Sequence, residues 1–212
     1  KPFTTGKSPS LGGVPHDRYG MTTQGINEYV HGVLDELGLQ ETEVTKVQTG
    51  GPDGDLGSNE IKITKDKTIA VVDGSGVLYD PVGINRTELL RLAERRVMVR
   101  EFDRSLLSPE GFLIRIEDHD VTLPNGSKVP NGEHFRNSFH LQQFIRADLF
   151  VPCGGRPRSI NIGNWDKMLD ERRQPRFRAI VEGANLFITQ DARLRLEEAG
   201  IISGYRAILD PI

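Results

Sequence analysis

Cysteine is almost absent from this sequence of 212 residues, which contains Cys153 alone. A single cysteine excludes an internal disulfide and is typical of proteins from a reducing compartment. The five histidines and this cysteine form no pair with the spacing of a zinc site, so we expect no metal. Stability must therefore come from a hydrophobic core, which a chain of this length is large enough to build.

Two further absences restrict the partners. No apolar run approaches the roughly 20 residues that a membrane-spanning helix requires, so we expect no membrane partner. The 27 Lys and Arg residues are outnumbered by 30 Asp and Glu, which gives a net charge of −3. Proteins that bind nucleic acid neutralise phosphates with an excess of basic residues. We therefore expect no nucleic-acid partner.

The chain begins at Lys1 rather than at a methionine, and its first residues read like sequence from the middle of a protein. We expect it to be a piece of a longer protein whose targeting segment, if any, lies elsewhere. A reducing compartment then leaves the cytoplasm or the mitochondrion as the expected location.

Helical and strand patterns alternate along the sequence. Apolar spacing and flanking residues predict helices over 22–39, 56–63, 87–98, 135–145 and 190–199, with Asn85 as the N-cap of the third. Short apolar runs predict strands over 44–48, 68–72, 112–116, 149–151 and 179–181. Such alternation predicts an α/β fold of the Rossmann-like, doubly wound type, with a mostly parallel sheet and helices on both faces.

The region from about 102 to 146 interrupts this alternation. Asn125-Gly126 lies between two short runs with β propensity and predicts an inserted β-hairpin. We interpret the region as a surface elaboration. The alternative is a regulatory or subunit contact made by His134, Phe135, Arg136 and His140.

The turn after the first core strand is the main candidate for a ligand site, because this turn binds the pyrophosphate of a dinucleotide in doubly wound folds. It reads Gly50-Gly51-Pro52-Asp53-Gly54-Asp55-Leu56-Gly57. Gly54 and Gly57 have the spacing of the second and third glycines of G-x-G-x-x-G, whereas the first is displaced to Gly51 by one residue. An ordinary turn is the alternative, because a glycine-rich turn after a strand is often no more than a turn. Asp53 and Asp55 would repel a pyrophosphate unless their carboxylates point away, and they could cap the helix instead.

Asp73 is a second sign of dinucleotide binding. It ends the next strand about 20 residues after the glycines, where the ribose-binding acid of the fingerprint lies. A carboxylate there accepts hydrogen bonds from ribose hydroxyls and repels the 2′-phosphate of NADP, which favours NAD. The alternative is that Asp73 only opens the turn that continues to Gly76.

Several segments, in the same order along the chain, resemble the glutamate dehydrogenases, and in particular their large-subunit, NAD-specific branch. The matching segments are Thr5–Pro9, Gln48–Ile61, Asp73–Pro81, Phe150–Pro157 and Val181–Thr189. The match covers nearly the whole chain and becomes poor from Ile202 onward.

The resemblance implies an NAD-binding domain, with an entry segment and helix over 1–40, a Rossmann-like core over 41–212 and no substrate domain. The intact enzyme would deaminate L-glutamate oxidatively to 2-oxoglutarate and ammonia, in amino-acid catabolism, with hydride transfer to NAD. The catalytic lysine and aspartate of the family belong to the substrate domain that precedes this one. We therefore expect no catalytic residue here, no turnover by this chain alone, and homo-oligomer contacts outside it.

The resemblance also implies roles for individual residues. Backbone contacts to the pyrophosphate would come from Gly54, Asp55 and Leu56, in the turn shaped by Gly51 and Gly57, and Asp73 would bind the ribose. The nicotinamide end would involve Thr22, Asn185, Cys153 and Gly154. From the residues alone, Thr22 could instead be a helix N-cap and Asn185 a left-handed turn residue.

Two alternative functions stay open. One is another amino-acid dehydrogenase, acting on leucine, valine or phenylalanine, because substrate recognition lies mostly outside this region. The other is a non-catalytic nucleotide-sensing module, because a fold does not fix a function.

Overall fold

The computed structural model describes residues 4–5, 8–16 and 18–205. In this part of the chain, seven strands form the central sheet in the order β11-β10-β9-β3-β4-β5-β6. Their bounds are β3 Thr45–Thr49, β4 Lys67–Asp73, β5 Gly76–Tyr79, β6 Phe112–Arg115, β9 Ala147–Pro152, β10 Phe177–Glu182 and β11 Ile202–Tyr205. The strands from β11 to β4 are mutually parallel, whereas β5 pairs antiparallel with β4 and β6. The predicted mostly parallel α/β fold is confirmed, and β5 and β11 are strands that the sequence patterns did not predict.

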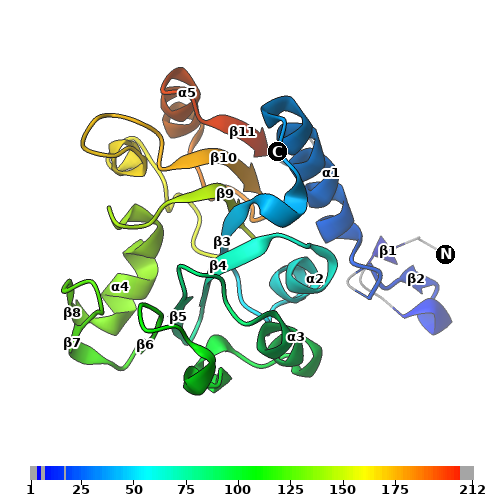
Figure 1. Cartoon of the computed structure of the whole chain (residues 1–212). Coiled ribbons are helices and arrows are strands. Elements are labelled where there is room, and N and C mark those ends of the chain that lie inside the picture. The colour runs from blue at the N-terminus through cyan, green and yellow to red at the C-terminus, as the bar shows by residue number, and fades with distance from the viewer. Residues whose placement is uncertain (1–3, 6–7, 17, 206–212) are drawn as a thin grey trace.

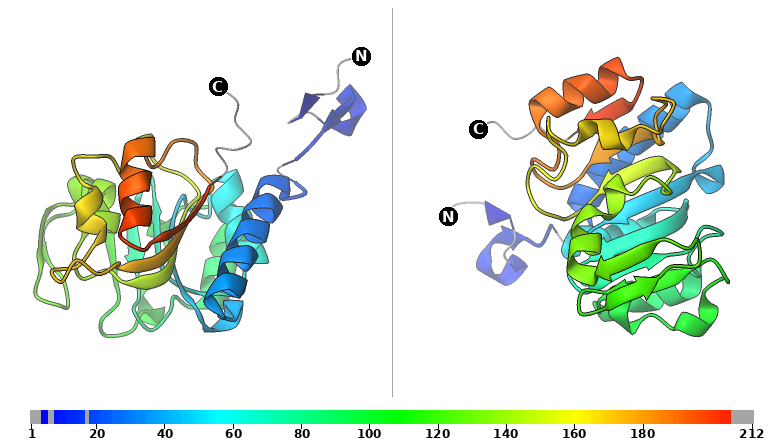
Figure 2. Two further views of the ribbon diagram at one scale, coloured as in Figure 1. Left: turned by 90° about the horizontal axis from the view of Figure 1, so that it is seen from above. Right: turned by 90° about the vertical axis from the view of Figure 1, so that its left-hand side faces the viewer.

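Helices cover both faces of this sheet (Figures 1 and 2). The five helices that the structure describes are α1 Met21–Leu37, α2 Asp55–Ile63, α3 Arg86–Arg95, α4 Gly132–Ser138 and α5 Gln190–Glu198. Helices α1, α2 and α3 lie on one face, and α4 and α5 lie on the other. No helix in the described residues is long and apolar enough to cross a membrane.

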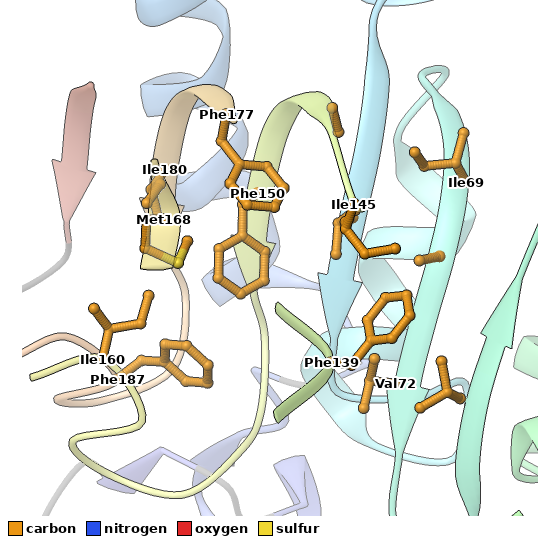
Figure 3. Close-up of a cluster of buried hydrophobic side chains, with 14 of the residues drawn as sticks. Ile69, Val72, Phe139, Ile145, Phe150, Ile160, Met168, Phe177, Ile180 and Phe187 are labelled. Carbon is orange, nitrogen blue, oxygen red and sulfur yellow. The ribbon is translucent and has the colours of Figure 1, made fainter. Parts of the chain in front are cut away.

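Alternating side chains along the central strands supply both layers of the core. In β9, Leu149 and Val151 pack against α1, whereas Phe150 points to the opposite face. On that face Phe150 lies among buried aromatic rings that include Phe177 and Phe187 (Figure 3). A strand buried on both faces has this continuous apolar character, which explains why the predicted strands read as apolar runs.

The inserted hairpin is confirmed. Strands β7 His119–Thr122 and β8 Lys128–Asn131 pair antiparallel, and Gly126 takes the positive φ of 83° that the turn requires. The helix predicted over 135–145 is wrong in extent, because α4 ends at Ser138 and a 3-10 turn over Phe139–Leu141 follows.

A small parallel pair, β1 Thr4–Thr5 and β2 Gly13–Val14, stands apart from the central sheet beside the start of α1 (Figure 2). Residues 1–3, 6–7 and 17 of the predicted entry segment lie outside the described part of the chain.

Candidate dinucleotide site

A cavity of about 340 Å³ opens at the carboxyl ends of β3, β4 and β9. Parallel strands end together at one edge of a sheet, so the loops after them meet there, as in other doubly wound folds. The cavity is lined by most of the predicted cofactor residues, namely Gly51, Gly54, Asp55, Leu56, Gly57, Asp73, Cys153 and Gly154. Segments that are a hundred residues apart in the sequence thus form one concave site.

The N-terminus of α2 points its free backbone donors at this cavity. Gly54 is the N-cap residue and no side chain caps the helix. The first N–H groups of a helix have no partner within the helix, so those of Asp55, Leu56 and Gly57 are free to bind an anion. All three residues line the cavity. A phosphate group therefore fits this end of the site.

The glycines of the turn have three different surroundings. A Cβ on Gly57 would lie within 3.0 Å of the carbonyl oxygens of Gly50 and Gly51, so only glycine lets α2 approach the turn. A Cβ on Gly51 would meet the Asp73 side chain equally closely. A Cβ on Gly54, by contrast, would have Gly51 O at 3.7 Å as its nearest neighbour and would otherwise point into open space. The contact with Asp73 thus explains why position 51, the displaced first glycine of the motif, must be a glycine. The space next to the Cα of Gly54 is open.

Asp73 lines the cavity and also holds the following turn. Its Oδ1 accepts hydrogen bonds from the Ser75 N–H and hydroxyl, both at 2.7 Å, and its Oδ2 accepts one from Val99 N at 2.7 Å. Burial raises the pKa of the Asp73 carboxyl above its ordinary value, while these hydrogen bonds act in the opposite direction. Each carboxylate oxygen can accept more than one hydrogen bond, so a ribose contact and the turn contacts are compatible.

The two acidic residues within the turn differ in their environment. Asp55 forms an ion pair with Arg96 at 2.6 Å and its side chain is 68% exposed, so its charge is partly offset by the guanidinium and by solvent. Asp53 lies close enough to Asp73 for its negative charge to oppose ionisation of the Asp73 carboxyl and raise that group's pKa further. Within the turn, the charge of Asp55 is thus offset by Arg96, whereas the charge of Asp53 is not offset by an ion pair in the described part of the chain.

Thr22 and Asn185 are not among the residues that line this cavity. Thr22 lies in the first turn of α1, whose N-cap is Gly20, so the interpretation of Thr22 as an N-cap is wrong. Asn185 is exposed on the loop after β10, and the residue with a left-handed backbone there is Leu186, with φ 55°. The interpretation of Asn185 as the left-handed residue is therefore also wrong.

The loop that carries Asn185 is held by Glu182, the last residue of β10. Its Oε1 accepts a hydrogen bond from Ile188 N at 2.8 Å, and burial raises the pKa of this carboxyl to about 7. The sequence patterns did not single out this acid, although it ends a strand as Asp73 does.

The opposite wall of the cavity comes from the region predicted to be a surface elaboration. Arg136, Asn137 and His140 of α4 and the turn after it line the same cavity as the glycine turn. His140 is buried against Phe150 and Phe187, and this burial lowers the pKa of its imidazole to about 4. No local pattern in the sequence placed Arg136 and His140 at this cavity.

A buried ion cluster lies between α2 and the sheet. Lys46 Nζ of β3 lies 3.2 Å from Glu60 Oε1 of α2 and 2.7 Å from Asp66 Oδ2 ahead of β4. Burial alone would lower the pKa of Lys46, but the two carboxylates together raise it above its ordinary value. The cluster ties the helix to the two strands beneath it. Among the described residues no group of His, Cys, Asp and Glu side chains could hold a metal.

Comparisons with known proteins agree with this geometry. Glutamate dehydrogenase 2 of Dictyostelium discoideum is 61% identical over 202 residues, which cover 95% of this chain and 19% of that protein. A probable NAD-specific glutamate dehydrogenase of Schizosaccharomyces pombe is 56% identical over 203 residues, which cover 95% and 18% of the two chains. The chain thus spans about a fifth of the length of these relatives, which confirm the resemblance seen in the sequence.

The fold also occurs in solved structures. The crystal structure of Plasmodium falciparum glutamate dehydrogenase superposes with a TM-score of 0.64 at 19% identity, over 95% of this chain and 38% of that one. The family model of the glutamate/leucine/phenylalanine/valine dehydrogenases matches residues 12–208, so the expectation of a poor match from Ile202 onward is corrected. The chain belongs to the glutamate/leucine/phenylalanine/valine dehydrogenase family.

Proposed function

We propose that this chain is the NAD-binding domain of an NAD-specific glutamate dehydrogenase, with an entry segment over 1–40 and a Rossmann-like core over 41–212. The names of the relatives that are 52–61% identical support this proposal. The observation that carries it is the uncapped N-terminus of α2, which faces the same cavity as the strand-ending carboxylate of Asp73.

The residues of the cavity divide the work of binding. The N–H groups of Asp55, Leu56 and Gly57 bind the pyrophosphate, and the helix dipole favours the negative charge there. The Asp73 carboxylate accepts hydrogen bonds from the ribose hydroxyls and repels a 2′-phosphate, which selects NAD over NADP. Cys153 and Gly154 form the wall at the end of β9 toward the nicotinamide ribose.

The nicotinamide itself lies toward Thr22 and Asn185, outside the cavity that this chain forms. NAD supplies the hydride acceptor, and the protein fixes its position relative to the substrate. In the parent enzyme this chemistry is the oxidative deamination of L-glutamate to 2-oxoglutarate and ammonia. The catalytic lysine and aspartate are expected in a separate substrate domain, so this chain alone gives no turnover, and the parent forms a homo-oligomer through other regions. The cytoplasm or the mitochondrion is the proposed location.

Isothermal titration calorimetry of this chain with NAD and with NADP tests the proposal. We expect NAD to bind and NADP to bind at least about tenfold more weakly, because the Asp73 carboxylate accepts from NAD and repels NADP. Asp73→Ala should remove this preference. Ser75→Ala is the matched control, because it removes one of the turn contacts of Asp73 and leaves the carboxylate in place.

Both variants need a thermal unfolding curve, since Asp73 also accepts a hydrogen bond from Val99 N. A folded Asp73→Ala variant that keeps the full preference for NAD contradicts the assigned role of Asp73. Equal binding of NAD and NADP by the unaltered chain, or no binding of either at millimolar concentration, contradicts the proposed function.

A further inference from the structure

The wall of the cavity opposite the glycine turn is built by the region over 102–146, through α4. Arg136 and Asn137 of this helix and His140 just after it line the cavity. The interpretation of this region from sequence gave it no part in ligand binding. Helices α4 and α2 lie on opposite faces of the sheet, so this region reaches the cavity from the other face than the glycine turn does.

The wall of the cavity that includes the glycine turn is negatively charged. Asp53, Asp55 and Asp73 all line the cavity on the side of the glycine turn. Asp55 is offset by Arg96, and Asp73 accepts three hydrogen bonds, yet neither arrangement removes the charge of Asp53. A pyrophosphate carries negative charge of its own, and like charges at close range oppose one another. Binding such a group here therefore calls for a cation on the other side.

Arg136 is the cation that meets this need. Its side chain forms no ion pair or hydrogen bond within the described part of the chain, and its Nε is buried without a partner. Arg156, the other basic residue of that wall, has a side chain that is 71% exposed and lies 3.9 Å from Glu133. His140 adds no charge at neutral pH, because burial lowers the pKa of its imidazole to about 4.

Arg136 is presented from a firmly held helix. Asn131 caps α4 by accepting a hydrogen bond from His134 N at 2.7 Å. Phe135 is buried, with its ring centroid 5.6 Å from that of Phe139. After the helix, His140 stacks on Phe150 of β9 at 5.9 Å. The helix is thus held on both sides of Arg136, so the backbone position from which the arginine reaches the cavity is fixed before a ligand arrives.

We propose that Arg136 binds the pyrophosphate of the dinucleotide from the side opposite α2, so that the anion lies between the helix N–H groups and a guanidinium supplied by the 102–146 region. The inference rests on the proposed function, because it names a further residue of the same site. Arginine suits this role, since its planar guanidinium donates two parallel hydrogen bonds to phosphate oxygens.

Titrations with ligands of decreasing length test the inference. NAD, ADP and adenosine are titrated into the unaltered chain and into Arg136→Gln. The matched control is Arg146→Gln, because Arg146 belongs to the same 102–146 region, pairs with Asp170 at 3.0 Å and does not line the cavity. We expect Arg136→Gln to weaken NAD and ADP at least about tenfold, because a hydrogen bond to a charged group is lost. Adenosine, which has no phosphate, should bind both proteins equally. Arg146→Gln should bind all three ligands like the unaltered chain.

Arg136→Lys separates charge from geometry and serves if Arg136→Gln fails to fold. It should fall between the unaltered chain and Arg136→Gln for NAD and ADP, because it keeps the charge and loses the paired donors. If the unaltered chain binds NAD and neither folded variant is weakened, the inference is overturned while the proposed function stands. If the unaltered chain does not bind NAD, the proposed function fails and the inference fails with it.

Discussion

Helices α2 and α3 lie side by side on one face of the sheet, and their first turns are built in opposite ways. At the start of α3, Asn85 Oδ1 accepts a hydrogen bond from Glu88 N at 3.0 Å. At the start of α2, Gly54 offers no side chain, and the first N–H groups face a cavity. The two helices share a buried cluster, with Ile61 of α2 packed among leucines of α3.

This difference shows how a helix N-terminus that only stabilises the fold can be distinguished from one that binds a ligand. A glycine at the N-cap, as in α2, makes a helix less stable than a good N-cap side chain by only a few tenths of a kcal/mol, whereas an alanine there costs about 1 kcal/mol. Helix α2 omits the cap at the point where a ligand can supply the missing acceptors, whereas α3 keeps its cap although Arg86 and Leu89 at its start line a different cavity. The absence of a cap is therefore as informative as the glycines that replace it.

The substitution with the largest expected effect on stability disrupts the packing of α2 against the turn before it. Gly57→Ala places a methyl group within 3.0 Å of two backbone carbonyl oxygens, which cannot move without shifting the turn. We expect the free energy of unfolding to fall by about 3 kcal/mol or more. Urea denaturation followed by circular dichroism measures it, and a loss below about 1 kcal/mol would show that the helix and turn are not packed as described.

Gly54→Ala tests the same turn without breaking it. The backbone at Gly54, with φ −82° and ψ 152°, suits any residue, and the added methyl has open space around it. We expect an unchanged unfolding temperature and NAD binding weakened at least about tenfold, because the methyl occupies the place of a phosphate. Calorimetry on a variant shown to be folded decides this, and full affinity for NAD would place the phosphates elsewhere.

Asn85→Ala removes the N-cap side chain of α3, which is the kind of cap that α2 does not have. The lost hydrogen bond to Glu88 N should lower the free energy of unfolding by about 1 kcal/mol. NAD affinity should not change, because the start of α3 does not line the cavity. A weaker NAD affinity in this variant would mean that the two helix ends are coupled and do not have separate roles.

The smallest effect concerns the acid at the start of α2. Asp55 and Arg96 form an exposed ion pair, with side chains 68% and 35% exposed. Asp55→Asn should therefore change the free energy of unfolding by less than about 1 kcal/mol. NAD should bind slightly more tightly, since one negative charge near the pyrophosphate is removed. A clearly weaker affinity would show that Asp55 contributes through its side chain.

The parts of the site that were predictable are those with local causes. The glycine turn, the acid at the end of β4 and the Asn125-Gly126 hairpin each follow from backbone conformations or spacings that a short segment of sequence reveals. The N-cap at Asn85 was predictable for the same reason.

The remaining parts depend on contacts between distant segments. Strand β5 returns directly from β4 and pairs antiparallel with both β4 and β6, and its partner β6 begins only at Phe112, far along the chain. Arg136 reaches the cavity that Gly54 also lines because α4 packs on the sheet through buried rings such as Phe135. The sequence around Arg136 does not indicate that it lies near Gly54, and the sequence around Gly54 does not indicate Arg136. This wall of the cavity could therefore be found only in the folded chain.

The most direct test of the account follows the backbone amide resonances of this chain by NMR during a titration with NAD. The account predicts large shift changes for the amides of Asp55, Leu56 and Gly57 at the free end of α2, and none for Glu88 at the capped end of α3. Changes of equal size at both helix ends, or changes confined to residues away from the cavity, would contradict it.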